Sequence, residues 1–267
     1  MSTGHVYFVG AGPGAPDLLT LRGRDLIERA DVVIYADSLV DPILTEFAHE
    51  GAEIIGSSTM TLEQIMDRMV SATQAGQTVV RLQSGDPAIY GAVHEQTARL
   101  DEAGVAWSIV PGVSAGFAAA AILGCELTVP EVAQTVIFTR ISGRASPVPP
   151  KEELRSLASH QTSLVIFLAI NYIRRVVDEL IAGGYPIDTP AAVVYRATWP
   201  DELVLTGTLA TIADQSRAAK LTKQALIMVG PALARASHAE LRSRLYSPDH
   251  THLFRTGSDR KPRTVKA

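Results

Sequence analysis

The sequence predicts two α/β domains, the first with a mainly parallel sheet and the second with a mixed sheet of more antiparallel character. Three observations carry this prediction. Strand–loop–helix units repeat in the first half, glycine-bearing turns follow three of the expected strands, and the pattern changes after residue 115. The turns are GAGPG after residues 6–9, SGDP after residues 79–82 and PGVSA after residues 108–110.

These three turns also predict a ligand site. A β-branched run followed by glycine and a helix is typical of a parallel sheet, and ligands bind beyond the carboxyl ends of its strands. Glycine in such a turn lets the backbone approach a ligand closely because it has no Cβ atom. Three such turns in series therefore favour a small-molecule pocket at this edge of the first sheet.

The first domain is expected over residues 1–115, with strands at residues 6–9, 32–35, 53–55, 79–82 and 108–110. An amphipathic helix lies between the third and fourth strands, because apolar or small side chains recur at helical spacing there. Thr61 and Gln64 have capping-box spacing at its start, and Gly76 is expected to end it. The apolar face consists of Leu62, Ile65, Met66, Met69, Val70 and Thr73.

The second domain is expected over residues 116–245, followed by a polar tail at residues 246–267. Strands are predicted at residues 135–139 and 164–168, on either side of a polar, proline-bearing loop at residues 142–153. Loops of that length in compact domains are often functional. A helix that ends at Gly183 follows, and then strands at residues 192–195, 203–206 and 225–229, with a helix between the last two.

The first turn has the spacing of a dinucleotide-binding fingerprint. Gly10, Gly12 and Ala15 match the pattern G-x-G-x-x-G/A. Asp31 and Asp37 lie about 20 residues further on, where that fingerprint places an acidic residue. A nicotinamide-dependent oxidoreductase is therefore one hypothesis for the function.

The prolines of the same turn argue against a pyrophosphate. A pyrophosphate binds to free backbone N–H groups at the start of a helix, and proline has no N–H group. Pro13 and Pro16 remove two such donors, and the next helical pattern begins only after Asp17. We therefore expect a nucleoside-like ligand without phosphates.

The composition narrows the classes of partner. The net charge of −4 and the isoelectric point near 6.0 argue against nucleic acid, whose phosphates need a basic face. The single cysteine, Cys125, cannot form an internal disulfide, which fits a reducing cytoplasm. No apolar run is long enough to span a bilayer, and the first strand begins too early for a signal peptide. We therefore expect a cytoplasmic protein that binds neither membrane nor nucleic acid.

The usual catalytic and metal-binding motifs are absent. The sequence has no HExxH, CxxC, P-loop or GxSxG segment, and its seven histidines are scattered, so no metal site is expected. A reaction driven by an activated cofactor needs mainly positioning and a dry pocket. Methyl transfer from a sulfonium is such a reaction, because the leaving group is already cationic.

Asp86 in the SGDP turn has two interpretations. Pro87 holds it in an extended conformation, which would aim its backbone groups or its carboxylate at a ribose or an amino-acid group. A plain turn at the end of a strand explains the motif equally well.

Several segments, in order along the chain, resemble the tetrapyrrole methyltransferases, which use S-adenosylmethionine. They are GAGPGAPDLLTLRG, YADSLV, RLQSGDPAIYGAVHEQ and IVPGVSA. Later segments are similar to the branch of that family that methylates ring carbon 11 of precorrin-4, giving precorrin-5 and S-adenosylhomocysteine in cobalamin biosynthesis. These are GRASPVPPKEEL, TSLVIFLA, VVYRATWPDELVLTGTL, QALIMVG and SRLYSPDHTHLFR. The resemblance covers nearly the whole chain and implies a homodimer whose active site lies in a trough between the two domains.

The resemblance also implies a site for S-adenosyl-L-methionine at the positions that match the family motifs. Most of these residues would act through main-chain groups, which explains why small residues recur among them. Leu168 stands where several relatives carry methionine, a change that keeps the side-chain volume. The expected cofactor residues are Pro13, Ser84, Gly85, Asp86, Ile89, Ser114, Ala115, Leu168, Ala197 and Ala225.

The chain departs from the relatives that act on uroporphyrinogen. Those carry YDRLV, a lysine after the third strand, and GGDPFxFGR, where this sequence has YADSLV, Gly56-Ser57-Ser58 and SGDPAIYGA. These differences argue against the uroporphyrinogen reaction and leave its proton donor unassigned. Asp37 is the one carboxylate beside the expected site and is the catalytic candidate; a solvated loop aspartate is the alternative.

A tetrapyrrole substrate carries many carboxylates, which arginine pairs bidentately. Arg140, Arg144 and Arg196 lie near the expected loops and are the candidates for substrate binding. Two questions stay open at this point: whether the substrate carries cobalt, and which ring carbon is attacked. A macromolecular target, as in relatives that act on ribosomal RNA or on a translation factor, is disfavoured by the acidic balance of the chain.

Overall fold

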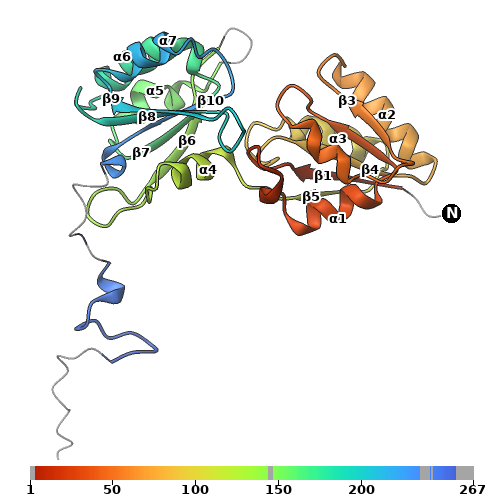
Figure 1. Cartoon of the computed structure of the whole chain (residues 1–267), viewed down its shortest axis with the longest axis horizontal. Coiled ribbons are helices and arrows are strands. Elements are labelled where there is room, and N and C mark those ends of the chain that lie inside the picture. The colour runs from red at the N-terminus through yellow and green to blue at the C-terminus, as the bar shows by residue number, and fades with distance from the viewer. Residues whose placement is uncertain (1–3, 144–146, 235–240, 242, 257–267) are drawn as a thin grey trace, which may run out of the picture.

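The computed structural model describes residues 4–143, 147–234, 241 and 243–256. Two α/β domains lie side by side, and each contains a five-stranded sheet (Figure 1). The first sheet is parallel and the second is mixed, which confirms the fold class predicted from the sequence.

All five strands of the first sheet run parallel, in the order β3-β2-β4-β1-β5. Both faces of this sheet are buried, as is usual for parallel pairing. Helices α2 (Leu62–Gln74) and α3 (Val93–Glu102) cover one face, and α1 (Leu21–Arg29) covers the other. The strands are β1 (His5–Gly10), β2 (Val32–Tyr35), β3 (Glu53–Gly56), β4 (Thr78–Gln83) and β5 (Trp107–Val110).

The capping box predicted for the helix between β3 and β4 is present. The Gln64 N–H donates to Thr61 Oγ1 at 3.3 Å, and the Thr61 N–H donates to Gln64 Oε1 at 2.9 Å. Gly76 follows the helix with a φ of 81°, a left-handed conformation that ends helices readily when the residue is glycine. Met69, on the predicted apolar face, is fully buried.

The second sheet has the strand order β6-β7-β10-β8-β9. Strands β6 and β7 are parallel, whereas β10 is antiparallel to β7 and β8, and β9 is antiparallel to β8. Helices α5 (Leu154–Ala158), α6 (Ile173–Ala182) and α7 (Ile212–Ala218) cover one face, and α4 (Ala115–Ile122) covers the other. The strands are β6 (Val136–Arg140), β7 (Ser163–Phe167), β8 (Pro190–Tyr195), β9 (Leu203–Thr208) and β10 (Ala225–Val229).

Strand β7 ends one residue earlier than the sequence predicts. Leu168 has a φ of 55°, so the chain turns out of the sheet after Phe167. Short 3-10 helices occupy several connections, namely Pro16–Leu18, Pro42–Phe47, Pro150–Glu152, Ile170–Tyr172, Pro231–Leu233 and Arg244–Tyr246.

Two features are missing from the described ranges. None of the helices in those ranges is long and apolar enough to cross a membrane. Among the same residues, no group of three or more histidine, cysteine, aspartate or glutamate side chains is arranged to hold a metal ion.

Candidate functional site

The first two glycine turns are bonded to each other at the carboxyl edge of the first sheet. The Gly85 N–H donates to the Gly12 carbonyl at 2.8 Å, and the Gly12 N–H donates to the Gly85 carbonyl at 3.2 Å. Gly85 has a φ of 64°, and glycine adopts this conformation without strain. The turns after β1 and β4 therefore form one bonded unit.

Gly10 and Gly112 allow the backbones of neighbouring turns to approach each other closely. A Cβ atom on Gly112 would lie 2.2 Å from the Gly85 carbonyl oxygen, and one on Gly10 would lie 2.6 Å from Gly112 Cα. Backbone from neighbouring turns already fills this space. At Gly10 and Gly112 the missing Cβ atom therefore makes room for the contact between the loops.

Asp86 joins the second turn to the third. Its Oδ1 accepts from the Ala88 N–H at 2.8 Å and its Oδ2 accepts from the Gly112 N–H at 2.9 Å. Of the two interpretations of the SGDP motif, the contacts therefore match the turn. The carboxylate orders the edge by holding two main-chain donors.

Ser114 and Ala115 stand at the start of α4, next to the bonded turns. Ser114 is the N-cap, and its Oγ accepts from the Gly116 N–H at 3.3 Å. A Cβ atom built on Gly85 would lie 3.6 Å from the Ala115 nitrogen, so the two loops lie close together. Four of the expected residues, Ser84, Gly85, Ser114 and Ala115, therefore lie together.

The expected residues of the second domain also share one sheet edge. Leu168 follows the end of β7, Ala197 follows the end of β8, and Ala225 begins the antiparallel strand β10 opposite Tyr195. The backbone here is unusual, because Leu168, Arg196, Thr198 and Gln224 all have φ between 44° and 67°. Residues held in this region cost conformational energy and gather at functional sites. Leu168 is in addition 71% exposed, although it is a large apolar side chain.

The two edges are joined by hydrogen bonds across the domains. Trp199 Nε1 donates to the Pro13 carbonyl at 3.0 Å, and the Ala15 N–H donates to Thr198 Oγ1 at 2.9 Å. Gln224 Nε2 donates to the Ser38 carbonyl at 3.0 Å. The carboxyl edge of the first sheet is thus fastened to the edge of the second sheet that carries Ala197 and Ala225.

Sequence reasoning missed Thr198 and Trp199 as part of this edge. They lie in the segment ATWPDE, where a large aromatic side chain stands before a proline in a polar turn between two strands. That signal marks an anchored turn, but it does not say which segment the tryptophan contacts.

Two N–H donors of the first turn are already engaged, and its two prolines offer none. The Gly12 and Ala15 N–H groups donate within the protein, and Pro13 and Pro16 have none. The first regular helix begins only at Leu21. These four positions offer a pyrophosphate no free N–H group, so the edge is a poor cradle for a dinucleotide. Small side chains, carbonyl oxygens and the exposed Leu168 suit a cationic group attached to a nucleoside.

The Asp37 side chain joins the loop after β2 to the loop after β3 by hydrogen bonds. Its Oδ2 accepts from Ser58 Oγ at 2.6 Å and its Oδ1 accepts from the Ser58 N–H at 2.7 Å. The bond from the Ser58 hydroxyl is the main cause that lowers the pKa of Asp37. A carboxylate with a lowered pKa is a weaker base. These contacts therefore favour the loop aspartate of the two roles considered.

Arg81 is a buried cation near Asp37 that sequence reasoning did not find. It lies in β4 and its Nη1 donates to the Ile34 carbonyl at 3.3 Å. Burial lowers its pKa to about 10, against the opposing effect of the Asp37 charge. Arg81 is therefore still protonated at neutral pH.

The three candidate arginines have different surroundings. Arg140 ends β6 and donates to the carbonyls of Ile141 and Pro147, both at 3.2 Å. Arg196 Nη1 pairs with Asp201 Oδ2 at 2.5 Å, and its guanidinium lies 4.0 Å from the centre of the Trp199 ring. Arg144 lies outside the described residues.

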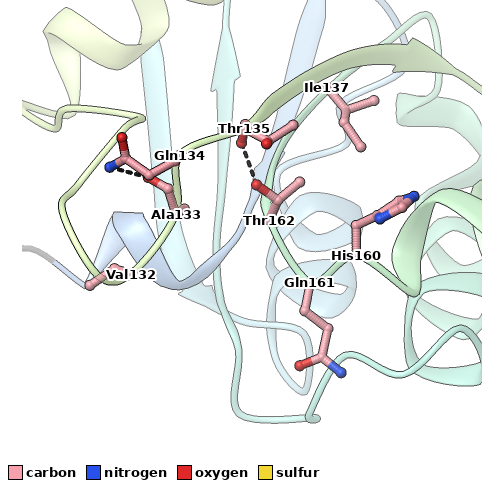
Figure 2. A pocket seen from close by; sticks show the side chains of 8 residues that line it. All are labelled: Val132, Ala133, Gln134, Thr135, Ile137, His160, Gln161 and Thr162. Atoms are coloured by element: carbon pink, nitrogen blue, oxygen red, sulfur yellow. Dashed lines mark hydrogen bonds between the residues drawn. The ribbon is translucent and has the colours of Figure 1, made fainter.

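A surface cavity of about 440 Å³ lies at the other end of the second sheet, where β6 and β7 begin (Figure 2). Gln134 Nε2 donates to the Ala133 carbonyl at 3.2 Å, and the Thr162 hydroxyl donates to the Thr135 carbonyl. Arg140 ends β6 and Leu168 follows the end of β7, both at the opposite ends of these strands, so this cavity is separate from the joined edges. Its lining is Val132, Ala133, Gln134, Thr135, Ile137, His160, Gln161 and Thr162.

The two joined sheet edges, with no free N–H group at Gly12, Pro13, Ala15 or Pro16, fit a methyltransferase that takes its methyl group from a sulfonium donor. The chain belongs to the Tetrapyrrole (Corrin/Porphyrin) Methylases, which it matches over residues 5–213. The methyl donor of this family is S-adenosylmethionine.

Two curated relatives are similar over almost their full lengths. A cobalt-precorrin-4 C(11)-methyltransferase of Methanocaldococcus jannaschii is 50% identical over 250 residues, which cover 94% of this chain and 95% of the relative. A precorrin-4 C(11)-methyltransferase of Pseudomonas aeruginosa is 44% identical over 252 residues, which cover 94% of this chain and 99% of the relative.

Two solved structures share the fold. A cobalt-precorrin-4 methyltransferase has a TM-score of 0.83 and 45% identity, covering 86% of this chain and 95% of its own. A uroporphyrin-III C-methyltransferase from Thermus thermophilus, in complex with S-adenosylhomocysteine, has a TM-score of 0.74 and 28% identity, covering 87% of this chain and 99% of its own.

Proposed function

We propose that this protein transfers a methyl group from S-adenosyl-L-methionine to ring carbon 11 of precorrin-4. The products are precorrin-5 and S-adenosyl-L-homocysteine, and the pathway is cobalamin biosynthesis. The observation that carries the proposal is the fastening of the two sheet edges through Trp199 and Pro13, which gathers the expected residues of both domains. The names of the two curated relatives support the choice of substrate.

The proposed cofactor site uses both edges. Pro13, Ser84, Gly85, Asp86 and Ile89 belong to the first two turns, and Ser114 and Ala115 to the start of α4. Leu168, Ala197 and Ala225 complete the site from the second domain. When bound, S-adenosylmethionine supplies an electrophilic methyl group on a cationic sulfur. The residues of the chain hold the reacting groups in line and exclude water, which is the main requirement of such a transfer.

Three arginines are proposed to bind the carboxylate arms of the substrate. Arg140 lies at the end of β6, beside the proposed site, and Arg196 follows β8 on the same edge of the second sheet. Arg144 belongs to the same proposal and lies outside the described residues. Because Arg196 already pairs with Asp201 and stacks on Trp199, its larger contribution is to order the turn that contacts Pro13.

Asp37 stays the proposed catalytic candidate, with two roles to separate. It would either accept a proton from the substrate or hold the loop that carries Ser58. The lowered pKa of its carboxyl group supports the second role.

We further propose that the protein works in the cytoplasm as a homodimer and acts on a small tetrapyrrole rather than on nucleic acid. The net charge of −4 supports the last point. Metal-free and cobalt-bearing precorrin-4 are both candidate substrates, since the relatives carry both names. Parallel assays with the two compounds decide between them, and gel filtration with light scattering measures the assembly.

Calorimetric titration with S-adenosylhomocysteine is the direct test of the cofactor site. We expect saturable binding, whereas NADH gives none because the Gly12 and Ala15 N–H groups are engaged and Pro13 and Pro16 have none. Nuclear magnetic resonance of the product made with a ¹³C-labelled methyl donor then assigns the methylated ring carbon. A methyl group at any carbon other than 11 would overturn the proposal for the reaction.

A further inference from the structure

Four aromatic rings form a continuous row beside the proposed cofactor site. Neighbouring ring centres are 5.3 Å apart for Phe117 and Phe138, 5.8 Å for Phe138 and Phe167, and 5.4 Å for Phe167 and Tyr90. Such separations are typical of favourable aromatic pairs. We call Phe117, Phe138, Phe167 and Tyr90 the aromatic row.

The row is open to solvent at both ends. Phe117 is 59% exposed and Tyr90 is 46% exposed, whereas the two central rings are half-buried. Tyr90 belongs to the first domain. Phe117 lies in α4, and Phe138 and Phe167 lie on the face of the second sheet that α4 covers. An exposed aromatic surface that crosses two domains is costly without a ligand or partner to cover it.

Each outer part of the row adjoins a residue of the proposed cofactor site. Phe117 lies in the first turn of α4, which Ser114 caps, and Tyr90 follows Ile89. Phe167 directly precedes the strained Leu168. The row therefore borders the place where the methyl donor is proposed to bind.

The backbone around Tyr90 is held in an unfavourable conformation. Tyr90 and Ala92 have φ of 56° and 51°, in the left-handed region. Gly91 between them has no room for a side chain, because a Cβ atom would lie 2.4 Å from the Pro87 carbonyl oxygen. Strain of this kind persists only where the surrounding structure enforces it. Here it directs the Tyr90 ring onto Phe167 of the other domain.

A positive charge stands at the Tyr90 end of the row. Arg140 is the register partner of Phe167 in the parallel pair β6–β7. Burial is the main cause that raises the pKa of the Tyr90 phenol; the charge of Arg140 lowers this pKa and the charge of Glu152 raises it, both by less. Tyr90 is therefore protonated at neutral pH, and its hydroxyl can donate a hydrogen bond.

We propose that the aromatic row is the platform on which the tetrapyrrole macrocycle lies, and that Tyr90 is a specificity-determining residue that donates a hydrogen bond to a substrate carboxylate beside Arg140. This inference rests on the proposed function. A large ring system with carboxylate arms matches a row of aromatic rings that ends at a phenol and a guanidinium.

The first experiment separates the hydroxyl from the ring. Tyr90→Phe keeps the ring and removes the donor, and we expect the KM for precorrin-4 to rise about tenfold, as for one lost hydrogen bond to a charged group. The kcat and the dissociation constant for S-adenosylhomocysteine stay within a factor of about two, because the cofactor contacts other residues. Tyr172→Phe is the control, since Tyr172 is a similarly exposed tyrosine outside the row.

The second experiment tests the platform through binding alone. Uroporphyrin serves as a stable fluorescent macrocycle, and its binding to the intact protein is followed by the change in its emission. We expect Phe117→Leu and Tyr90→Leu each to weaken this binding about tenfold or more, as for a lost stacking surface, while calorimetry shows unchanged S-adenosylhomocysteine affinity.

The outcomes are distinct. Wild-type KM in Tyr90→Phe overturns the role of the hydroxyl, and wild-type porphyrin binding in both leucine variants overturns the platform. If the leucine variants lose affinity for uroporphyrin and for S-adenosylhomocysteine equally, the aromatic row serves the packing of the domains, and the inference is also overturned. If the wild-type protein binds S-adenosylhomocysteine and uroporphyrin but forms no precorrin-5, the proposed reaction fails while the platform is still decided by the leucine variants.

Discussion

Trp199 Nε1 donates to the Pro13 carbonyl at 3.0 Å and thereby fastens the first glycine turn to the second domain. The same indole lies against Gly14, since a Cβ atom at that position would come within 2.3 Å of Trp199 Cδ1. The Arg196 guanidinium lies over the same ring, 4.0 Å from its centre. The proposed cofactor site therefore borders one tryptophan that belongs to none of the three glycine turns.

The contact between Gly14 and Trp199 predicts the effect of adding one methyl group. Gly14→Ala forces the indole away from Pro13, and we expect a loss of about 1–3 kcal/mol in the free energy of unfolding. Weaker S-adenosylhomocysteine binding should accompany it, measured by calorimetry. Gly143→Ala is the matched control, because a Cβ atom there meets nothing within 4 Å. Equal behaviour of the two variants would contradict this account of the domain contact.

The two bonds of Asp86 predict a coupled loss of loop order and cofactor affinity. Asp86→Ala removes the acceptor of the Ala88 and Gly112 N–H groups, and we expect destabilisation of about 1–3 kcal/mol. The dissociation constant for S-adenosylhomocysteine should rise as well. Asp41→Ala, which removes a comparable bond to the Ile43 N–H, should leave that constant unchanged. A cofactor affinity that survives in Asp86→Ala would show that the turn orders itself without the carboxylate.

Arg196 is expected to act through the turn that it supports. Arg196→Ala removes the stacking on Trp199 and should cost about 1–2 kcal/mol of stability. Arg196→Lys should restore little, because an ammonium group lacks the planar surface of guanidinium. Arg174→Ala, which breaks an exposed ion pair with Asp214, should change stability by less than about 1 kcal/mol. Thermal unfolding of the three variants measures these effects, and full rescue by lysine would point to charge alone.

The lowered pKa of Asp37 predicts a pH dependence of stability. The folded state favours the charged carboxylate, so Asp37 adds to the free energy of unfolding at pH values above its unfolded pKa of 3.8. This stabilisation is lost as the pH falls through the lower pKa that Asp37 has in the folded state. The stability difference between the wild type and Asp37→Asn should therefore be constant near neutral pH and shrink below pH 3.8. Urea unfolding at several pH values tests this. A difference that grows towards acid pH would reverse the sign and contradict the assignment.

The same variant separates the two proposed roles of Asp37. If Asp37 only holds the loop that carries Ser58, Asp37→Asn should keep the rate of methylation within about tenfold of the wild type, because the amide still accepts one hydrogen bond from Ser58. If Asp37 instead accepts the proton in the reaction, Asp37→Asn should lower kcat by about 100-fold or more. Single-turnover assays across neutral pH distinguish these outcomes.

Much of the secondary structure of the first domain could be predicted from the sequence, because the patterns that indicate it span only a few neighbouring residues. The alternation of short β-branched runs with helical periodicity gives the strands, and Thr61, Gln64 and Gly76 mark the ends of α2. The prolines of the first turn also argued against a pyrophosphate from the sequence, since a missing N–H group is a property of the residue. The bonds of Gly12 and Ala15 strengthen that argument.

Other features depend on contacts between distant segments. Ala15 and Thr198 are 183 positions apart, and Pro13 and Trp199 are 186 apart, so no local pattern links them. The partner of the Asp86 carboxylate could not be foreseen either, because Gly112 belongs to another loop. The row from Phe117 to Tyr90 joins a helix, two strands and a loop.

Residue order alone was enough to establish two α/β domains, the chemical character of their turns and a nucleoside ligand without phosphates, because hydrophobic periodicity and the backbone chemistry of glycine and proline act over a few neighbouring residues. Folding decided which carboxylates serve the loops, which tryptophan joins the domains and where aromatic rings gather. Those outcomes depend on the packing of segments that are remote in sequence, and neither composition nor spacing records such packing.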